Sequence, residues 1–230
     1  MVDFHSHILP SIDDGSESVE ESVQLLDKLS QQGISQVVAT PHFYADQRTI
    51  ERFLTKREEA YNRLRDRIKT DHPQIRLGAE VLYYPGISRL DGIEKLCIEG
   101  TRVLLLEMPV ARWSDSTIRE VIEIAVSYNL TLVLAHIERY VFLQHPGVLE
   151  ELLNNGVLMQ VNASLFTDWF TRRKGFKLLD NHAMHLLGSD CHGVRNRPPQ
   201  MGEACHILSK KYGNDILVQM KAFAKELLSV

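Results

Sequence analysis

The chain has few cysteines, no long hydrophobic run and no apolar leader. Its three cysteines, Cys97, Cys191 and Cys205, share no close spacing, so we expect no disulfide framework and a reducing compartment. No run of about 18 apolar residues is present, so no transmembrane helix is expected. A signal peptide is not expected either, because polar His5 and His7 stand where its apolar segment should begin. These absences predict a cytoplasmic protein without membrane insertion.

An excess of positive charge is also lacking. The 230 residues include 26 Lys and Arg against 30 Asp and Glu, which gives a formal net charge of −4. That balance provides no electrostatic reason to expect a nucleic-acid partner or a membrane surface. Hydrophobic residues make up 44% and charged residues 24%, as in ordinary globular proteins. No linker, low-complexity tract or repeat divides the chain, so residues 1–230 are expected to form one domain.

Strand-like and helix-like segments alternate from one end of the chain to the other. Seven short apolar runs predict strands, at residues 1–4, 34–40, 75–84, 102–108, 131–136, 157–162 and 184–189. Helical patterns predict helices at residues 16–32, 48–70, 88–97, 116–128, 146–154, 170–182, 203–212 and 215–228. Ser16 is the expected N-cap of the first helix. This alternation predicts a parallel α/β sheet whose two faces are both covered.

Almost every predicted strand leads into a side chain that can bind a metal ion. The nine candidates are His5, His7, Asp14, His42, Glu80, Glu107, His136, Asp190 and His192. Any one of them has an ordinary explanation, as a hydrogen-bonded core residue or a cap. An open doubly wound sheet would gather such residues at one switch point. Candidates from nearly every strand instead favour a barrel, in which the carboxyl ends of the strands converge.

The types of donor indicate the chemistry of the site. His5 and His7 are two residues apart and share one face of a strand. Glu80 lies inside an apolar strand, and a buried carboxylate is costly unless it is paired or binds a metal. Imidazole and carboxylate donors without thiolate suit Mn, Fe or Zn in a catalytic cluster. Nine donors exceed the needs of one ion, so two or three divalent ions are expected. Asp13, the residue before the candidate ligand Asp14, is expected to be a turn or capping residue.

The charge of such a cluster favours an anionic substrate. Four ionised carboxylates and three divalent ions would leave about two positive charges, before Arg139 or Arg197 is added. Multi-metal sites hydrolyse phosphate esters by generating hydroxide and clamping the phosphoryl oxygens. A phosphate ester is therefore the expected substrate. The aromatic residues that follow strand ends are candidate walls of its pocket, although loop packing explains any one of them: Phe43, Tyr44, Tyr84, Trp113, Phe166 and Trp169.

Seven sequence blocks resemble a known superfamily. They read FHSHILPSIDDGS, TPHF, GAEV, LLLEMP, AHIERY, VNAS and GSDCHGVRNRPP. Together they resemble the polymerase-and-histidinol-phosphatase (PHP) superfamily, and more narrowly its bacterial protein-tyrosine phosphatases of the capsule and exopolysaccharide type. The resemblance covers residues 1 to about 200, and the opening block is its most specific part. Residues 165–171 depart from the small Ser/Gly-containing turn that is usual in relatives, which leaves substrate choice open.

The resemblance implies a distorted (β/α)7 TIM-like barrel with three metal ions, often manganese. The implied ligand sets are His5, His7, Glu80 and Asp190 for one ion, Glu80, Glu107 and His136 for a second, and Asp14, His42 and His192 for a third. Arg139 and Arg197 match positions that grip phosphate, and Asp14 is a candidate catalytic residue as well as a ligand. The implied substrate is the phosphorylated tail of a bacterial tyrosine autokinase that controls polysaccharide synthesis.

Three alternatives and the oligomeric state stay open at this point. A small phosphate monoester such as histidinol phosphate would suit the same superfamily. A cysteine phosphatase would use Cys191, because residues 191–197 read C-x5-R. A degenerate barrel that binds a partner without catalysis is the non-enzymatic alternative, and a homo-oligomer is compatible with all of these.

Overall fold

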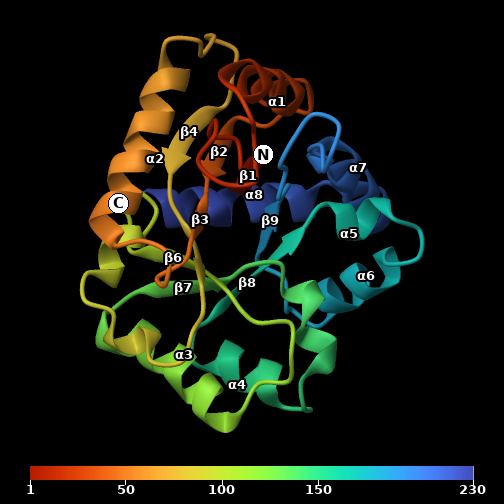
Figure 1. Cartoon of the computed structure of the whole chain (residues 1–230). Helices are drawn as coiled ribbons and strands as arrows, with labels where there is room; N and C mark the ends of the chain where they lie inside the picture. Colours follow the sequence, from red (N-terminus) through yellow and green to blue (C-terminus); the bar gives the residue numbers. More distant parts are fainter. Residues whose placement is uncertain (230) are drawn as a thin grey trace.

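The computed structural model describes residues 1–229, which are built around a strongly curled parallel sheet (Figure 1). Its strands pair in the orders β1-β2-β4 and β3-β5-β6-β7-β8-β9. Their bounds are β1 (Val2–Ser6), β2 (Gln36–Ala39), β3 (His42–Phe43), β4 (Gln74–Leu77), β5 (Glu80–Leu82), β6 (Val103–Glu107), β7 (Thr131–Leu134), β8 (Leu158–Asn162) and β9 (Leu186–Gly188). All the pairings are parallel. The parallel α/β architecture expected from the sequence is confirmed.

The predicted strand at 75–84 is interrupted, and the strand at 34–40 is followed by a short strand that was not predicted. Residues 34–40 contain β2, and β3 begins beyond them at His42, after Pro41; residues 75–84 contain most of β4 and then β5 after Gly78. The pairing continues through both interruptions, because Gly78 N donates to Ala39 O at 2.8 Å and Glu80 N donates to Pro41 O at 3.0 Å. A proline has no N–H to offer to the next ladder bond. The two interruptions bring His42 and Glu80 directly opposite each other in register.

The first and last strands lie side by side. Ser6 and Cys191 form a parallel bridge, and Asp190 N donates to His5 O at 2.8 Å while His7 N donates to Cys191 O at 2.9 Å. The sheet therefore curls far enough to bring β9 against β1. This arrangement is compatible with a distorted TIM-like barrel.

Helices cover the outside of the curled sheet (Figure 1). They are α1 (Val19–Gln31), α2 (Ile50–Arg65), α3 (Asp115–Ser127), α4 (Val148–Asn154), α5 (Ser164–Thr167), α6 (Arg172–Asp180), α7 (Met201–Tyr212) and α8 (Asp215–Leu228). Four short 3-10 helices are η1 (Ile87–Arg89), η2 (Ile93–Leu96), η3 (Ile137–Arg139) and η4 (Val141–Leu143). The predicted helix at 88–97 is thus two 3-10 turns, and the helices predicted at 48–70 and 170–182 are shorter than expected.

The first helix begins two residues later than predicted. Ser18 is its N-cap, and its side chain accepts a hydrogen bond from Glu21 N at 3.1 Å. The expected cap, Ser16, is buried and its hydroxyl bonds to Ser18 O at 2.9 Å. Both serines satisfy the residue preference of a cap, and the buried position of Ser16 decides between them.

The inside of the sheet is apolar at one end and polar at the other. A cluster that includes Phe4, Leu105 and Val133 fills the interior, and Ala224 and Leu228 of α8 close it. Figure 1 shows α8 crossing behind the strands. The carboxyl ends of the strands are left for the histidines and acids.

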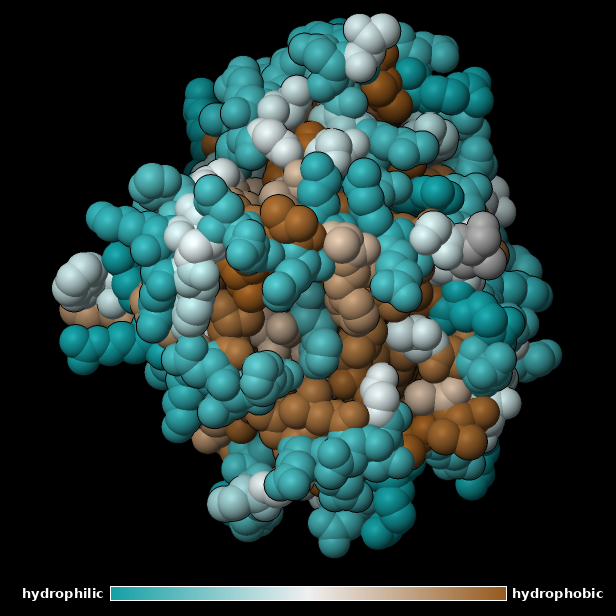
Figure 2. Space-filling view, turned by 180° about the vertical axis from the view of Figure 1, so that it is seen from behind, coloured by the Kyte–Doolittle hydropathy of each residue, from teal (hydrophilic) through white to brown (hydrophobic). Residues whose placement is uncertain are grey.

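The outer surface is that of an ordinary folded protein. Seen from behind, hydrophilic side chains cover much of it, and apolar side chains show between them (Figure 2). Within residues 1–229, no helix combines the length and apolar character needed to cross a membrane.

Candidate metal centre at the carboxyl ends of the strands

All nine ligand candidates converge at the carboxyl ends of the strands. Four overlapping groups bring their ligand atoms within 4.8 Å of one another: His7, Asp14, His42 and His192; His5, His7 and Asp190; His5, Glu80 and His136; His42, Glu80 and Glu107. Histidine nitrogens and carboxylate oxygens at such separations can share metal ions. That these residues bind metal ions stays a prediction, and this geometry is compatible with it.

The tautomers of His5 and His7 direct two lone pairs at one point. Gln160 Oε1 accepts from His136 N at 2.7 Å and lies 3.2 Å from His5 Nδ1, so His5 Nδ1 must carry a proton. His7 Nδ1 donates to Asp13 Oδ2 at 2.8 Å. When both rings are neutral, as metal binding requires, their Nε2 atoms carry lone pairs and lie only 3.1 Å apart. A cation between them resolves this repulsion, so the donor set fits a metal ion.

Glu80 sits at the centre of the imidazoles. The residue is 1% exposed, and its Oε1 lies 2.7 Å from His136 Nε2. Its Oε2 lies 3.0 to 3.3 Å from nitrogens of His5, His7 and His42, but no side chain in residues 1–229 forms a well-aligned hydrogen bond with it. Burial would raise the pKa of Glu80, but the imidazoles around it, His5 first and then His136, hold that pKa well below its usual range. Several nitrogens that lie close to one carboxylate oxygen without forming aligned hydrogen bonds to it are typical of ligands arranged around a shared metal ion.

Asp190 connects the imidazoles to two arginines. Its Oδ1 lies 3.6 Å from His7 Nε2. Its Oδ2 accepts from Arg139 Nη2 at 2.6 Å, Arg197 Nη2 at 2.5 Å and Asn162 Nδ2 at 2.7 Å. The arginine side chains are 36% and 40% exposed, so both guanidinium groups face solvent as well. The two arginines and Asp190 line one cavity of about 280 Å³. The structure therefore places two cations at the edge of the candidate metal centre, where an anion can reach them.

Among the outer ligand candidates, Asp14 is the most accessible. Asp14 has a side chain that is 68% exposed, and its Oδ1 lies 3.3 Å from His42 Nε2 and 3.5 Å from His192 Nε2. Burial, together with the charges of His7 and Arg197, lowers the pKa of His192 to about 4. A neutral imidazole beside an exposed carboxylate is the form in which both groups bind a metal.

Glu107, unlike Glu80, is not fully buried, because its side chain is 16% exposed. Its Oε1 lies 3.4 Å from His136 Nε2 and 3.6 Å from Arg139 Nη1. Burial and the charge of Glu80 raise its pKa. Glu107 therefore joins the other residues of the candidate metal centre to Arg139.

The backbone is strained at three of the candidate residues. His136, Asp190 and Arg197 have φ angles of 32°, 50° and 56°, in the left-handed region that residues with a side chain rarely adopt. Each costs on the order of 1–3 kcal/mol. Strain of this kind persists where the surrounding contacts fix a side-chain direction, which is frequent at functional sites.

Comparison with known proteins identifies the family. A family model described as capsular polysaccharide synthesis, CpsB/CapC, matches residues 1–227. The chain belongs to the CpsB/CapC family. Tyrosine-protein phosphatase CpsB of Streptococcus agalactiae is 31% identical over 94% of this chain and 92% of that protein, and CpsB of Streptococcus pneumoniae is 31% identical over 93% and 91%. Tyrosine-protein phosphatase YwqE of Bacillus subtilis is 28% identical over 99% and 91%. The resemblance inferred from the sequence blocks is confirmed.

The fold agrees with this family. A chain from the crystal structures of YwqE from Bacillus subtilis and CpsB from Streptococcus pneumoniae, described as unique metal-dependent tyrosine phosphatases, matches with a TM-score of 0.85. The match covers 99% of this chain and 94% of that chain at 22% identity. It supports a curled parallel sheet of the kind that the pairing shows.

Within this CpsB/CapC chain, two groups of polar residues support the candidate ligands, and this role was not predicted from the sequence. The first group is Asp13 alone. Asp13, expected to be a turn residue, does accept from Gly15 N at 3.0 Å, but it also accepts from His7 Nδ1 and from His42 N. Burial would raise its pKa, but the bond from His7 lowers it to about 2. Gln160 and Asn162 are the second group. They are two residues apart on β8 and therefore share one face of the strand, and this spacing is the sequence pattern from which their role could have been predicted.

Cys191 is not placed to be a nucleophile in this CpsB/CapC chain. It is fully buried, and burial raises the pKa of its thiol far above the usual value. A cysteine phosphatase needs an accessible thiolate with a lowered pKa. The cysteine mechanism is therefore contradicted, although residues 191–197 match its short pattern.

The expected aromatic walls divide into three groups. Phe43, Trp113 and Phe166 are buried in the core. Tyr44 and Tyr84 line a cavity of about 380 Å³, and Tyr44 stacks on His42 with ring centroids 5.3 Å apart. The remaining residue, Trp169, is 71% exposed. Of the six expected wall residues, Tyr44 is thus the one that stacks on a candidate ligand.

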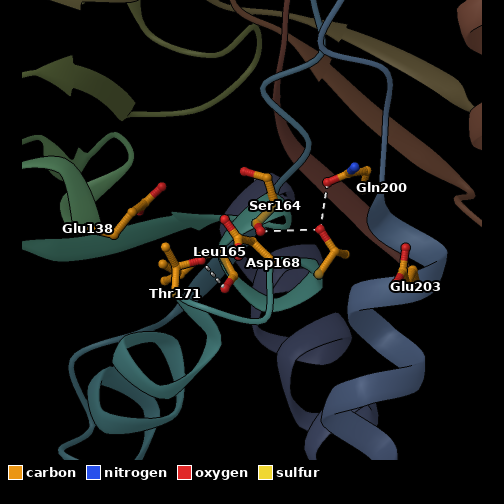
Figure 3. A pocket seen from close by; sticks show the side chains of 8 residues that line it. Glu138, Ser164, Leu165, Asp168, Thr171, Gln200 and Glu203 are labelled. Carbon is orange, nitrogen blue, oxygen red and sulfur yellow. Dashed lines mark hydrogen bonds between the residues drawn. The ribbon is translucent and has the colours of Figure 1, made fainter.

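The atypical 165–171 segment borders a third cavity, which is acidic (Figure 3). This cavity has a volume of about 550 Å³ and is lined by Glu138, Ser164, Leu165, Thr167, Asp168, Thr171, Gln200 and Glu203. Three of these residues, Glu138, Ser164 and Gln200, also line the cavity of the two arginines. Thr167 Oγ1 donates to Gln200 Oε1 at 2.7 Å and ties α5 to the start of α7. The segment therefore forms part of the rim beside the candidate anion site.

Proposed function

We propose that this chain is a metal-dependent phosphomonoesterase that hydrolyses phosphotyrosine on proteins. The single observation that carries the proposal is the position of Asp190, which faces the histidine cluster with one oxygen and holds Arg139 and Arg197 with the other. A cation cluster and a pair of guanidinium groups at one mouth suit a phosphate dianion. The tyrosine-protein phosphatases CpsB and YwqE, with which the chain shares 28–31% identity, support phosphotyrosine as the substrate.

We assign the ligands in three sets. His5, His7, Glu80 and Asp190 would hold one ion; Glu80, Glu107 and His136 a second; Asp14, His42 and His192 a third. The four proximity groups described above support these sets in part. His5, His7 and Asp190 share one group, and Asp14, His42 and His192 share another, which also contains His7. Glu80 is grouped with His5 and His136 and, separately, with His42 and Glu107. Manganese is the proposed metal, with iron or zinc as alternatives, because imidazole and carboxylate donors suit all three.

The residues of the chain have distinct parts in the reaction. When bound, the ions supply Lewis acidity that polarises phosphoryl oxygens and lowers the pKa of water. Arg139 and Arg197 bind the phosphoryl oxygens and neutralise their charge, since their Nη2 atoms are held by Asp190 and their outer faces are open. Asp14 is the most accessible carboxylate of the set and is the candidate to contact the leaving group. Tyrosinate, with a solution pKa of about 10, needs less protonic help than an alkoxide.

The wider assignment follows from the family. We infer that the protein substrate is a bacterial tyrosine kinase or its phosphorylated tail and that the reaction regulates capsular or exopolysaccharide synthesis, because the family model is one of capsular polysaccharide synthesis. We also infer one (β/α)7 domain spanning residues 1–230. In that count, β2 with β3 and β4 with β5 are each one interrupted strand, and the β9–β1 bridge closes the ring.

A substrate comparison tests the proposed function. The purified protein, loaded with Mn²⁺, should release phosphate from a phosphotyrosine peptide far faster than from a phosphoserine peptide or from histidinol phosphate. Excess EDTA should abolish the release. Full activity in EDTA would refute metal dependence, and a preference for histidinol phosphate would move the substrate to small monoesters.

A further inference from the structure

Glu21 bonds to the backbone of two segments that lie far apart in the sequence. It is in the first turn of α1. Its Oε2 accepts from Glu17 N at 2.9 Å, and its Oε1 accepts from Val194 N at 2.9 Å. One carboxylate thus joins the segment before α1 to the loop after β9.

Helix capping does not account for this arrangement. Ser18-x-x-Glu21 fits a capping box, in which the glutamate returns to the N–H of the cap residue itself. Here one oxygen accepts from Glu17, the residue before the cap, and the other reaches across to Val194. The residue before Val194 is Gly193. A Cβ atom at this position would lie 2.9 Å from Glu21 Oε1, which is closer than a Cβ atom normally approaches another atom. Capping alone requires neither the bond to Val194 nor a glycine at 193.

The two joined segments carry ligand candidates. Asp14 stands three residues before Glu17, and its side chain is 68% exposed. His192 stands two residues before Val194, and its Nε2 lies 3.5 Å from Asp14 Oδ1. Within residues 1–229, the Asp14 side chain has no hydrogen-bond partner besides these imidazole contacts, so backbone contacts must fix its distance from His192.

We propose that Glu21 is a positioning residue for the ion-binding group formed by His7, Asp14, His42 and His192. It sets the separation of the two segments and touches neither ion nor substrate. The inference rests on the proposed function only in that this group binds an ion. The loss of a contact that orients ligands typically weakens metal binding about 10–100-fold, and the same range is expected here.

Glu21→Gln tests the proposal, because it keeps the size of the side chain and the Ser18 cap but replaces one acceptor oxygen with a donating amide. We expect one ion fewer per chain by elemental analysis at limiting Mn²⁺. In titration calorimetry, the Mn²⁺ concentration that half-saturates the weakest site should be about 10–100-fold higher in Glu21→Gln than in the wild type. Glu20→Gln is the matched control, because the carboxylate of Glu20 is 66% exposed and, within residues 1–229, its one ion pair is with Arg67, at 3.3 Å. This control should bind ions as the wild type does.

Gly193→Ala disturbs the same contact from the loop after β9 and should weaken the binding of the same ion. Thermal unfolding in chelator separates positioning from folding, since Glu21→Gln and Glu20→Gln should then unfold at similar temperatures. Two results would overturn the proposal. One is equal ion content and affinity in Glu21→Gln and Glu20→Gln; the other is a lower unfolding temperature in chelator with unchanged ion affinity. In either case an active, metal-loaded wild type leaves the proposed function standing, whereas a wild type that binds no ions removes both.

Discussion

Glu80→Gln is the substitution that most directly tests how the candidate metal centre is built. The change keeps the shape of the side chain and removes its charge. Glu80 belongs to two of the proximity groups, one with His5 and His136 and one with His42 and Glu107. Its substitution should therefore disturb two ions at once.

The size of the effect follows from those contacts. Removing even an indirect partner of a metal ligand costs about 10–100-fold in affinity or activity, or roughly 1.4–2.7 kcal/mol. A carboxylate that binds two ions directly should cost at least that much at each, so roughly 3–5 kcal/mol in total is expected. That corresponds to a fall in kcat/KM of about 100- to 10,000-fold.

Glu107→Gln provides the comparison, because Glu107 appears in one proximity group only. Elemental analysis should show two ions lost per chain in Glu80→Gln and one in Glu107→Gln, and phosphate release should fall further in the former. Circular dichroism should show that both variants are folded. Equal ion losses in the two variants would refute the bridging position of Glu80, and full ion content in both would refute the ligand assignment itself.

Three further predictions follow from the same geometry. Asp13→Asn should raise the Mn²⁺ concentration for half-maximal activity about 10–100-fold, because the carboxylate that fixes the His7 tautomer becomes neutral; an unchanged Mn²⁺ titration would contradict this. Arg139→Ala and Arg197→Ala should each lower kcat/KM on a phosphotyrosine peptide about 10–100-fold with ion content retained, since a charge-assisted bond contributes about 1.5–3 kcal/mol; unchanged kcat/KM in both variants would remove the arginines from the anion site. Cys191→Ser should keep near-wild-type activity because the thiol is buried, and complete loss of activity with ions retained would revive the cysteine mechanism.

The strand-end residues could be located from the sequence because their signal is local. A polar donor that directly follows a short apolar run, as His136 follows β7, stands at the carboxyl end of a strand whatever the rest of the chain does. In a parallel sheet those ends lie on one side, so the convergence of the candidates follows from strand direction alone.

The residues that support the ligands could not be found in this way. Asp13 follows no strand, and its bond to His7 depends on the path of the 8–15 loop. The pairing of β3 with β5 was also missed, because β3 has only two residues and apolar content continues across Gly78, which separates β4 from β5. It matters for the site because the register that sets His42 opposite Glu80 begins only after the break. Local patterns thus predict which residues reach the site, whereas loop paths and register decide how they meet.

Asp190 gives the site a property that neither the ligands nor the arginines have alone. Its Oδ1 faces the histidines and its Oδ2 holds both guanidinium groups, so a movement of the carboxylate toward an ion would also move its arginine partners. Asn162 bonds the same oxygen at 2.7 Å and limits that movement. Because a single carboxylate is shared, loss of the nearby ion should weaken phosphate binding beyond the loss of the ion's own charge. Metal content and the affinity for inorganic phosphate should therefore vary together in ligand variants such as His7→Ala, and to a smaller extent in Asn162→Ala; phosphate affinity that is independent of metal content would show that the arginines bind the anion on their own.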